Sequence, residues 1–417
     1  MNLRRLGAAI ACASVVAVVL AACGGGNDDN GTTAASTGPK LTGAPIKVGG
    51  MVSSSGAQAA VLGGTGTVLK AWADHVNTSG GINGHPVQMT VLDDGGDPAK
   101  ALQNAKQLVE QDHVIAMVGF ISLADAAVAP YLDQKGIPVV GAAPVQTFIT
   151  DPNWFSSGAN LITLTYGTVD VAKKAGKTNL GVMYCAESPV CAQLVPLAQG
   201  IGGLVGIKIT PLKISATAPN YTAPCLQMKD SGVDALYIAD NGTVIQRVLA
   251  SCAQQGYNPL PVGQATTSTP DYLSDSNLDG ALSAGTNANP YDDSLPAVKE
   301  YRDAVNAEQD GFTDSSQFTY DAFLRWTGGL LFEAAGKAGN LGPDSTSNDV
   351  KQAIYKLKNE TLQGTSGPLV FTPGQPTQTP CWFTQKISGG DLVSENGNKP
   401  TCLTAEQGAA LAKALGG

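Results

Sequence analysis

Short aliphatic runs alternate with longer helical segments from Ile46 onward, and this alternation constrains the fold more than any other feature of the chain. The runs have the length and composition of buried strands, and they lie at 46–52, 87–93, 114–120 and 137–143. Helical periodicity between them predicts helices over 61–77, 98–111 and 122–134, the second opened by Asp97 and Pro98. Strands and helices that alternate in this way form a parallel sheet covered on both faces.

A second cycle of the same kind follows the segment WFSSGANL. Its predicted strands are 179–184, 207–213, 234–240 and 259–264. Four helices are predicted: one that ends at Gly176, one over 190–205, one near Leu226 and one over 244–255. The segment GALSAGTNANPYDD then leads into helices over 295–306, 317–338 and 349–357, with no strand between them. We expect these three helices to return to the first lobe. GPLVF and CWFTQKISGGDLVSE near the end indicate a strand and a hairpin.

The predicted fold class is therefore α/β, with two doubly wound lobes and a ligand cleft between them. The expected division of the chain is 1–23 as a lipoprotein signal peptide, 24–44 as a flexible tether, 45–157 with 287–365 as the first lobe, 158–286 with 366–403 as the second lobe, and 404–417 as a C-terminal tail.

The N-terminal segment has the layout of a signal peptide. Arg4 and Arg5 precede an apolar run over 6–22, and Cys23 follows it directly as the last residue of the sequence LAAC. The small residues before Cys23 resemble a bacterial lipobox, which predicts lipidation of that cysteine. The run also reaches the lower length limit of a spanning helix, so an uncleaved anchor is the alternative. Residues 24–43 are mostly Gly, Asn, Asp, Ser and Thr, a composition typical of a disordered tether.

Composition excludes some partners. The formal net charge is -9 and the charges form no long runs, which argues against binding to nucleic acid. Only 14% of the residues are charged, which suits an exported protein. We expect the protein to be a monomer on the extracytoplasmic face of the cell membrane, anchored through a lipid on Cys23.

Six cysteines remain beyond Cys12 and Cys23, and an even number in an exported chain favours disulfides. Each of them has one near neighbour in the sequence, so we predict three bridges: Cys185 with Cys191, Cys225 with Cys252, and Cys381 with Cys402. The alternative is a set of buried free thiols. None of the spacings is that of a zinc site.

The carboxyl ends of the predicted strands nominate the ligand-binding residues, because ligands of doubly wound sheets bind where the loops after the strands converge. The nominated residues are Ser54, Ser55, Ser122, Ala143, Pro144, Val145, Thr147, Tyr184, Glu187, Asp240, Asn241 and Gln264.

Some of these residues have a structural interpretation as well. Ser122, three residues before Asp125, also fits a helix N-cap, which would leave amide groups open to a carboxylate. Tyr184 suits either stacking on a ligand or packing in the core. Asp97 before Pro98 is predicted to cap a helix rather than to bind a metal.

The nominated residues are mostly neutral hydrogen-bonding groups. The sequence contains no HExxH motif, nucleophile elbow, Walker loop or paired-cysteine metal motif. We therefore expect binding rather than catalysis, with no cofactor and no metal.

The segment over 66–119 resembles the first lobe of the periplasmic leucine/isoleucine/valine-binding proteins. The resemblance rests on the turns NTSGGING and DDGGDP, and on the later segments GIPVV, SGVDALYI and SCAQQGYNP. It covers about 45–390 and implies a type I periplasmic-binding fold, which has two lobes joined by three crossover segments. It also implies a role as the substrate-binding protein of an ABC transporter, with the permease subunits as partners.

The resemblance also implies site residues. The ligand serine of the family corresponds to Ser122, and the loop that holds a ligand carboxylate corresponds to 143–145. Val145 stands where that loop usually has a hydroxyl, so Thr147 or a water is the expected substitute. The aromatic ligand residue of the second lobe corresponds to Asn241. The acid that binds an ammonium group corresponds to Gln264 or Ala265, so Asp240 or Glu187 would have to supply the charge.

The expected function is an extracytoplasmic receptor that closes two lobes around a small polar solute such as an amino acid, an amide or a small carboxylate. One alternative is a ligand-sensing ectodomain or receptor partner of the same fold. Another is an exported hydrolase, which would need a catalytic constellation that the sequence does not display.

Overall fold

The first of two large sheets contains only parallel pairs, as the strand and helix alternation predicts. The structure is a computed structural model, and it describes residues 41–414 apart from 42, 57–58, 142–144 and 188. The five strands run in the order β2-β1-β3-β4-β5. Their bounds are β1 (Ile46–Val52), β2 (Val87–Asp93), β3 (Met117–Val118), β4 (Val139–Gly141) and β5 (Trp154–Ser156).

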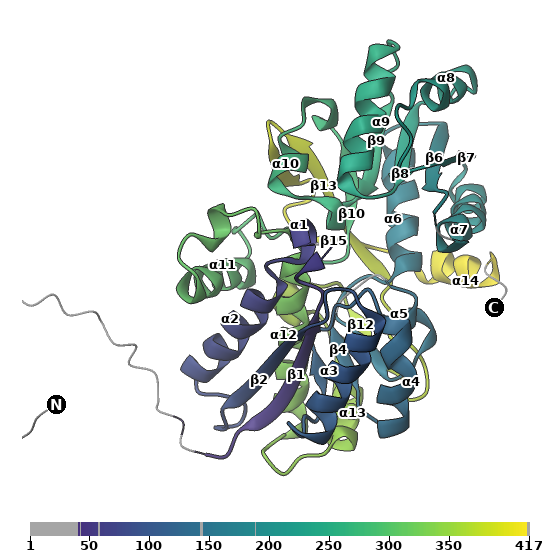
Figure 1. Cartoon of the computed structure of the whole chain (residues 1–417). Helices are drawn as coiled ribbons and strands as arrows, with labels where there is room; N and C mark the ends of the chain where they lie inside the picture. Colours follow the sequence, from purple (N-terminus) through teal and green to yellow (C-terminus); the bar gives the residue numbers. More distant parts are fainter. Residues whose placement is uncertain (1–40, 42, 57–58, 142–144, 188, 415–417) are drawn as a thin grey trace, which may run out of the picture. The chain divides into compact units, whose positions relative to one another are not determined.

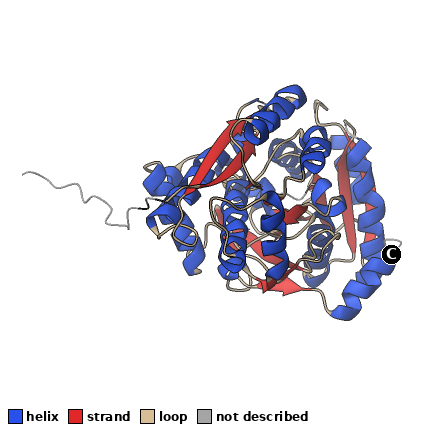
Figure 2. Ribbon diagram, turned by 90° about the horizontal axis from the view of Figure 1, so that it is seen from below, coloured by secondary structure: helices blue, strands red, loops and turns tan. Residues whose placement is uncertain are grey.

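Helices cover both faces of this sheet, so each face has its own apolar core (Figures 1 and 2). Val48 and Val118 point to one core and Met51 and Met117 to the other, as the alternation of side chains along a strand requires. The first core is covered by α2 (Thr65–Thr78), α11 (Pro296–Glu308), α12 (Tyr320–Gly339) and α13 (Ser347–Lys356), and the second by α3 (Pro98–Glu110), α4 (Asp125–Lys135) and α5 (Thr147–Thr150). The three helices after residue 295 thus pack with the first sheet, as expected.

Two predicted elements differ from the structure at glycines. The helix predicted over 61–77 is divided into α1 (Ala59–Leu62) and α2 at Gly63 and Gly64. A Cβ at Gly64 would lie 2.4 Å from the carbonyl oxygen of Gln317, so only glycine fits this close approach. The strand predicted over 114–120 is only two residues long, β3. It ends before Gly119, where φ is +62°, a conformation that side-chain-bearing residues rarely adopt.

The second sheet mixes parallel and antiparallel pairs. Its eight strands follow the order β14-β13-β10-β9-β8-β6-β7, and β15 pairs with β13. The strands are β6 (Asn179–Cys185), β7 (Lys208–Ile214), β8 (Ala235–Ala239), β9 (Leu260–Gln264), β10 (Leu282–Gly285), β13 (Cys381–Ser388), β14 (Asp391–Ser394) and β15 (Pro400–Cys402). We did not expect β10, which lies in the segment interpreted as a lead-in to helices. It pairs in parallel with β9 and antiparallel with β13.

The second sheet is also covered on both faces. One face carries α6 (Leu161–Lys174), α7 (Pro189–Val205) and α14 (Ala405–Ala414), and the other carries α8 (Thr222–Asp230), α9 (Gly242–Gln254) and α10 (Pro270–Leu273). The segment predicted as a tail therefore contains a helix, which buries Leu411 against the core beside α7. The remaining elements are β11 (Lys358–Glu360), β12 (Leu369–Val370) and the short 3-10 helices η2 (Ala265–Thr267), η3 (Ser276–Leu278), η4 (Phe312–Asp314) and η5 (Leu362–Gly364).

Three chain segments connect the two sheets, and they hydrogen-bond to one another. The Nδ2 of Asn287, after β10, donates to the carbonyl oxygen of Ser157, after β5, at 2.8 Å. The hydroxyl of Thr377, before β13, accepts from the backbone amide of Ser156 at 3.0 Å. Three connections are what the resemblance implies. The exact residues at which each lobe begins and ends stay a prediction.

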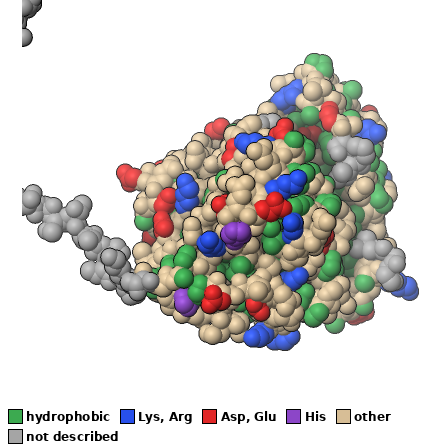
Figure 3. Space-filling view, turned by 60° about the horizontal axis from the view of Figure 1, so that its bottom comes forward, with side chains coloured by type: hydrophobic (Ala, Val, Ile, Leu, Met, Phe, Trp, Pro, Cys, Tyr) green, Lys and Arg blue, Asp and Glu red, His purple; other side chains and the backbone are tan. Residues whose placement is uncertain are grey.

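The three disulfides have the pairing expected from the sequence. Cys185 is bonded to Cys191, Cys225 to Cys252, and Cys381 to Cys402. The last two close loops of 27 and 21 residues, and each stabilises the fold by about 3 kcal/mol if chain entropy dominates. Lys, Arg, Asp and Glu side chains are interspersed on the face of the molecule shown in Figure 3, in keeping with the sequence.

Candidate functional site

Asp94 joins three loops at the carboxyl edge of the first sheet. Its Oδ1 accepts a hydrogen bond from Ser53 Oγ at 2.6 Å and one from the amide of Gly96 at 2.7 Å. Its Oδ2 accepts from Ser122 Oγ at 2.6 Å, and only 1% of the residue is exposed. Hydrogen bonds to a charged acceptor in such a site are strong, so the loops after β1, β2 and β3 are held in one arrangement.

Ser122 has a different structural role from the one predicted. Helix α4 begins at Asp125, and its N-cap position is Ala124, so the expectation that Ser122 is the N-cap was wrong. The hydroxyl of Ser122 donates to Asp94 and accepts from the amide of Ala124 at 3.0 Å. The buried carboxylate draws this hydroxyl toward the sheet edge, so the serine supports the loop before the helix. Its predicted contact with a ligand stays a prediction.

Ser54 and Ser55 bind the neighbouring carboxylate, that of Asp93. The Oγ of Ser54 donates to Asp93 at 3.1 Å, and both the hydroxyl and the amide of Ser55 donate to the same group. Burial raises the pKa of Asp93, but hydrogen bonds from Ser55, Gly95 and Ser54 outweigh it and hold the pKa below its usual value. These serines thus fix the loop after β1.

The loop after β4 is only partly described. Ala143 and Pro144 lie outside the described residues, whereas Val145 is half-buried and Thr147 begins α5. The hydroxyl of Thr147 donates to Asp125 Oδ2, in the first turn of α4. The Thr147 hydroxyl, which was expected to replace the one missing at Val145, is therefore already bonded to a carboxylate of the protein.

At the edge of the second sheet, Asn241 and Asp240 follow β8. Asn241 caps α9, because its Oδ1 accepts from the amide of Val244 at 3.1 Å. The Oδ1 of Asp240 accepts from the amide of Asn241 at 2.8 Å, while its Oδ2 is buried and has no hydrogen-bond partner among the described residues. Burial, together with the charge of Glu187, raises the pKa of Asp240.

Glu187 and Tyr184 lie near the same edge. The Oε1 of Glu187 accepts from Ser215 Oγ at 2.7 Å and from the amide of Ala216 at 2.9 Å. Tyr184 is half-buried on β6. Within the described part of the chain, neither side chain lines one of the two cavities described next.

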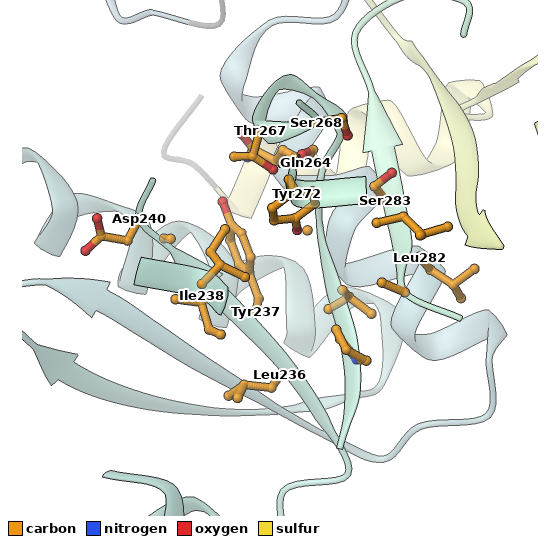
Figure 4. Close-up of a pocket in the computed structure, with 17 residues that line it drawn as sticks. Leu236, Tyr237, Ile238, Asp240, Gln264, Thr267, Ser268, Tyr272, Leu282 and Ser283 are labelled. Carbon is orange, nitrogen blue, oxygen red and sulfur yellow. Dashed lines mark hydrogen bonds between the residues drawn. The ribbon is translucent and has the colours of Figure 1, made fainter. Parts of the chain in front are cut away.

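A small cavity of ≈ 240 Å³ lies where β8 and β9 separate, and both apolar and polar side chains line it. The two strands are paired only as far as Tyr237 and Val262, which line the cavity together with neighbouring residues of both strands. Figure 4 shows its labelled polar side chains, which are Tyr237, Asp240, Gln264, Thr267, Ser268, Tyr272 and Ser283. We call it the polar cavity.

A larger cavity of ≈ 830 Å³ lies between elements of both sheets, and we call it the apolar cleft. Elements that follow the first sheet's strands contribute Asp125, Ala126, Val145, Gln146, Thr147, Ile149 and Thr150. Elements of the second sheet and its helices contribute Leu161, Ile162, Cys191, Gln193, Leu194, Leu197, Tyr237 and Gln264. Its size is in the range of about 300–1,000 Å³ that is common for small-molecule sites.

Tyr237 and Gln264 line both cavities, so they separate the apolar cleft from the polar cavity. Burial raises the pKa of the Tyr237 phenol well above its usual value. The phenol is therefore a neutral donor at physiological pH, which is the form suited to contact a solute.

The structure brings together only some of the nominated residues. Val145, Thr147 and Gln264 line the apolar cleft, and Asp240 and Gln264 line the polar cavity. The aliphatic residues of α6 and α7 that line the cleft were not among the nominated residues, because they lie within helices and not at strand ends. The run LVPLAQGIGGLV in α7 is apolar almost throughout, and this was the available signal. Among the described residues, no group of His, Cys, Asp and Glu has the arrangement of a metal site, and no helix is long and apolar enough to cross a bilayer.

Comparison with known proteins agrees with this geometry. A 32% identical stretch of 80 residues aligns with an amino acid binding protein from Pseudomonas aeruginosa, and it spans 19% of this chain and 21% of that relative. The solved leucine-binding protein of Thermotoga maritima has a TM-score of 0.68 at 15% identity, over 84% of this chain and 97% of that one. A fatty acid ABC transporter substrate-binding protein from Thermomonospora curvata has a TM-score of 0.69 at 17% identity, over 90% and 95%.

These likenesses show the type I periplasmic-binding fold. A family model described as periplasmic binding protein matches residues 45–391, which is most of the chain. The match includes the first sheet, the second sheet as far as β13, and every lining residue of the two cavities. The chain is thus a member of the periplasmic binding protein family.

Proposed function

We propose that this protein captures a small solute between two lobes and delivers it to the permease of an ABC importer. The observation that carries the proposal is the apolar cleft, because its lining comes from α4 and α5 on one side and from α6, α7, β8 and β9 on the other. A solute can contact both sides fully only when the two sides approach each other. It therefore binds the closed state more tightly than the open one and shifts the equilibrium toward closure.

The candidate solutes are an amino acid, an amide or a small carboxylate. Each has a polar group that Gln264, Thr147 or Tyr237 can contact and a remainder that fits among the aliphatic side chains. The unpartnered Oδ2 of Asp240 in the adjoining polar cavity would suit an ammonium group. Relatives bind ligands as different as leucine and fatty acids according to their names, which is consistent with a site adapted to one solute in each protein.

We propose further that the mature protein is a monomer held at the extracytoplasmic membrane surface by a lipid on Cys23. This residue and the tether lie outside the described residues. The signal-peptide layout and the family both support an extracytoplasmic location. Metabolic labelling with a radioactive fatty acid should mark the wild-type protein, and Cys23→Ala should abolish the label.

A thermal-shift screen followed by an uptake assay tests the function. A solute present at 100 times its dissociation constant adds about 2.7 kcal/mol, which raises the melting temperature by roughly 5–10 °C for lobes of this size. Deletion of the gene should abolish uptake of the same solute. Wild-type uptake in the deletion strain would contradict transport and favour a sensory role.

A further inference from the structure

Six aliphatic side chains in the apolar cleft are left half-buried by the fold. They come from four separate helices or loops on the two sides of the cleft: Val145, Ile149, Leu161, Ile162, Leu194 and Leu197. Scattered half-buried aliphatic residues are common on protein surfaces, but a continuous group lining one cavity marks a place where an apolar partner binds.

The lining follows one face of α7. Cys191, Leu194 and Leu197 are spaced by three residues, so they lie along the same side of the helix over about 9 Å. Val145 and Ile149 line the same cavity from elements that follow the strands of the first sheet. The apolar lining on α7 thus extends over nearly two turns of the helix, which is longer than the site needed for one short side chain.

Charged groups contribute little to this cavity. Asp125 is the one charged side chain among the described residues that line it, and its Oδ2 accepts a hydrogen bond from the Thr147 hydroxyl. No Lys, Arg or His side chain lines the cleft within the part of the chain that the structure describes. Affinity therefore has to come mainly from the burial of apolar area, since no ion pair with a basic side chain is formed there.

We infer that the solute of this receptor has an extended hydrocarbon body, such as an unbranched alkyl chain, which lies along α7 and is longer than the side chain of an amino acid. The inference rests on the proposed receptor function, and it replaces the small polar solutes named there with a solute class that has a longer apolar part. Polar groups line the cleft on both sides, with Gln146, Thr147 and Thr150 on one side and Gln193, Tyr237 and Gln264 on the other. The polar end of the solute would lie toward Tyr237 and Gln264, which also border the polar cavity.

Calorimetric titration of the full chain carrying Cys23→Ala tests the inference with two homologous series. The probes are hexanoate, octanoate and decanoate, and hexanol, octanol and decanol, each below the concentration at which it aggregates. The expected dissociation constant falls about four-fold for each added methylene group, with the same slope for both head groups. A dissociation constant that does not change with chain length in either series would overturn the inference.

A matched pair of variants on α7 locates the binding. Leu194→Asn, in the cleft, should weaken decanoate binding about ten-fold or more and flatten the chain-length slope. Leu204→Asn is the control, because Leu204 is 41% exposed on the same helix and does not line the cleft. Equal effects of the two variants would overturn the inference. The slope measured on the parent chain needs no variant, so it stands even if Leu194→Asn misfolds.

Small polar solutes separate this inference from the proposed function. If leucine, glutamine or benzoate binds with micromolar affinity while the alkyl series shows no slope, the receptor function stands and the extended solute is refuted. If no solute of either kind binds or raises the melting temperature, both proposals fail.

Discussion

Replacement of Asp94 by Asn tests whether this carboxylate organises the edge of the first sheet. Its Oδ1 serves Ser53 and Gly96, and its Oδ2 serves Ser122 alone. In Asp94→Asn, an amide nitrogen would replace Oδ2 and face a hydroxyl whose oxygen already accepts from Ala124. One charge-assisted bond is then lost and two become neutral, so the free energy of unfolding should fall by about 2–4 kcal/mol.

Urea denaturation at neutral pH measures this change. The midpoint should fall while the slope of free energy against urea stays constant, because the surface exposed on unfolding does not change. In a Ser122→Ala background, Asp94→Asn should cost less, with a coupling energy of about 0.5–3 kcal/mol between the two sites. A loss below about 0.5 kcal/mol for Asp94→Asn alone, or costs that simply add, would refute the role assigned to Asp94.

Three further predictions concern other parts of the molecule. Burial raises the pKa of Asp151 to about 6, so the folded protein keeps a proton that the unfolded chain loses, and the free energy of unfolding falls as pH rises from about 4 to 6. Asp151→Asn should therefore raise the melting temperature relative to wild type at pH 8 and leave it nearly unchanged at pH 3.5. Equal effects at the two pH values would contradict this. Replacing Cys185 and Cys191 by Ser should weaken solute binding more than it lowers the melting temperature. The reason is that the disulfide orders the segment at the edge of the apolar cleft in which Cys191 lies. A large fall in melting temperature with little change in the calorimetric dissociation constant would exclude that role. Gly158→Ala should lower the free energy of unfolding, measured in urea, by about 1–3 kcal/mol or more, because its Cβ would lie 2.1 Å from Asn287 Oδ1 where two of the connecting segments meet in the interior. An unchanged free energy of unfolding would show that these segments can move apart.

The sequence by itself determined the features that depend on neighbours along the chain. Strands β1 and β2 match their predicted ranges because the pattern of apolar residues that favours a buried strand is local and does not depend on distant parts of the chain. The cap of α3 formed where Asp97 precedes Pro98, since the bond from the amide of Lys100 spans only three residues. The disulfide pairing was predicted correctly because each cysteine is bonded to its near neighbour in the sequence, at separations of 6, 27 and 21 residues.

Tertiary structure decided what depends on residues far apart in the chain. The partners of Asp94 lie 41 and 28 positions away, so no local pattern could show that Ser53 and Ser122 bind one carboxylate. Strand β10 is recognisable only by its pairing with β9 and β13, the latter about a hundred positions later. The aliphatic lining of the apolar cleft likewise comes from several helices. Their positions along the chain could be predicted from the sequence, but their orientation relative to one another could not. Periodicity identifies which face of a helix is apolar, but packing alone decides how much of that face stays uncovered for a solute.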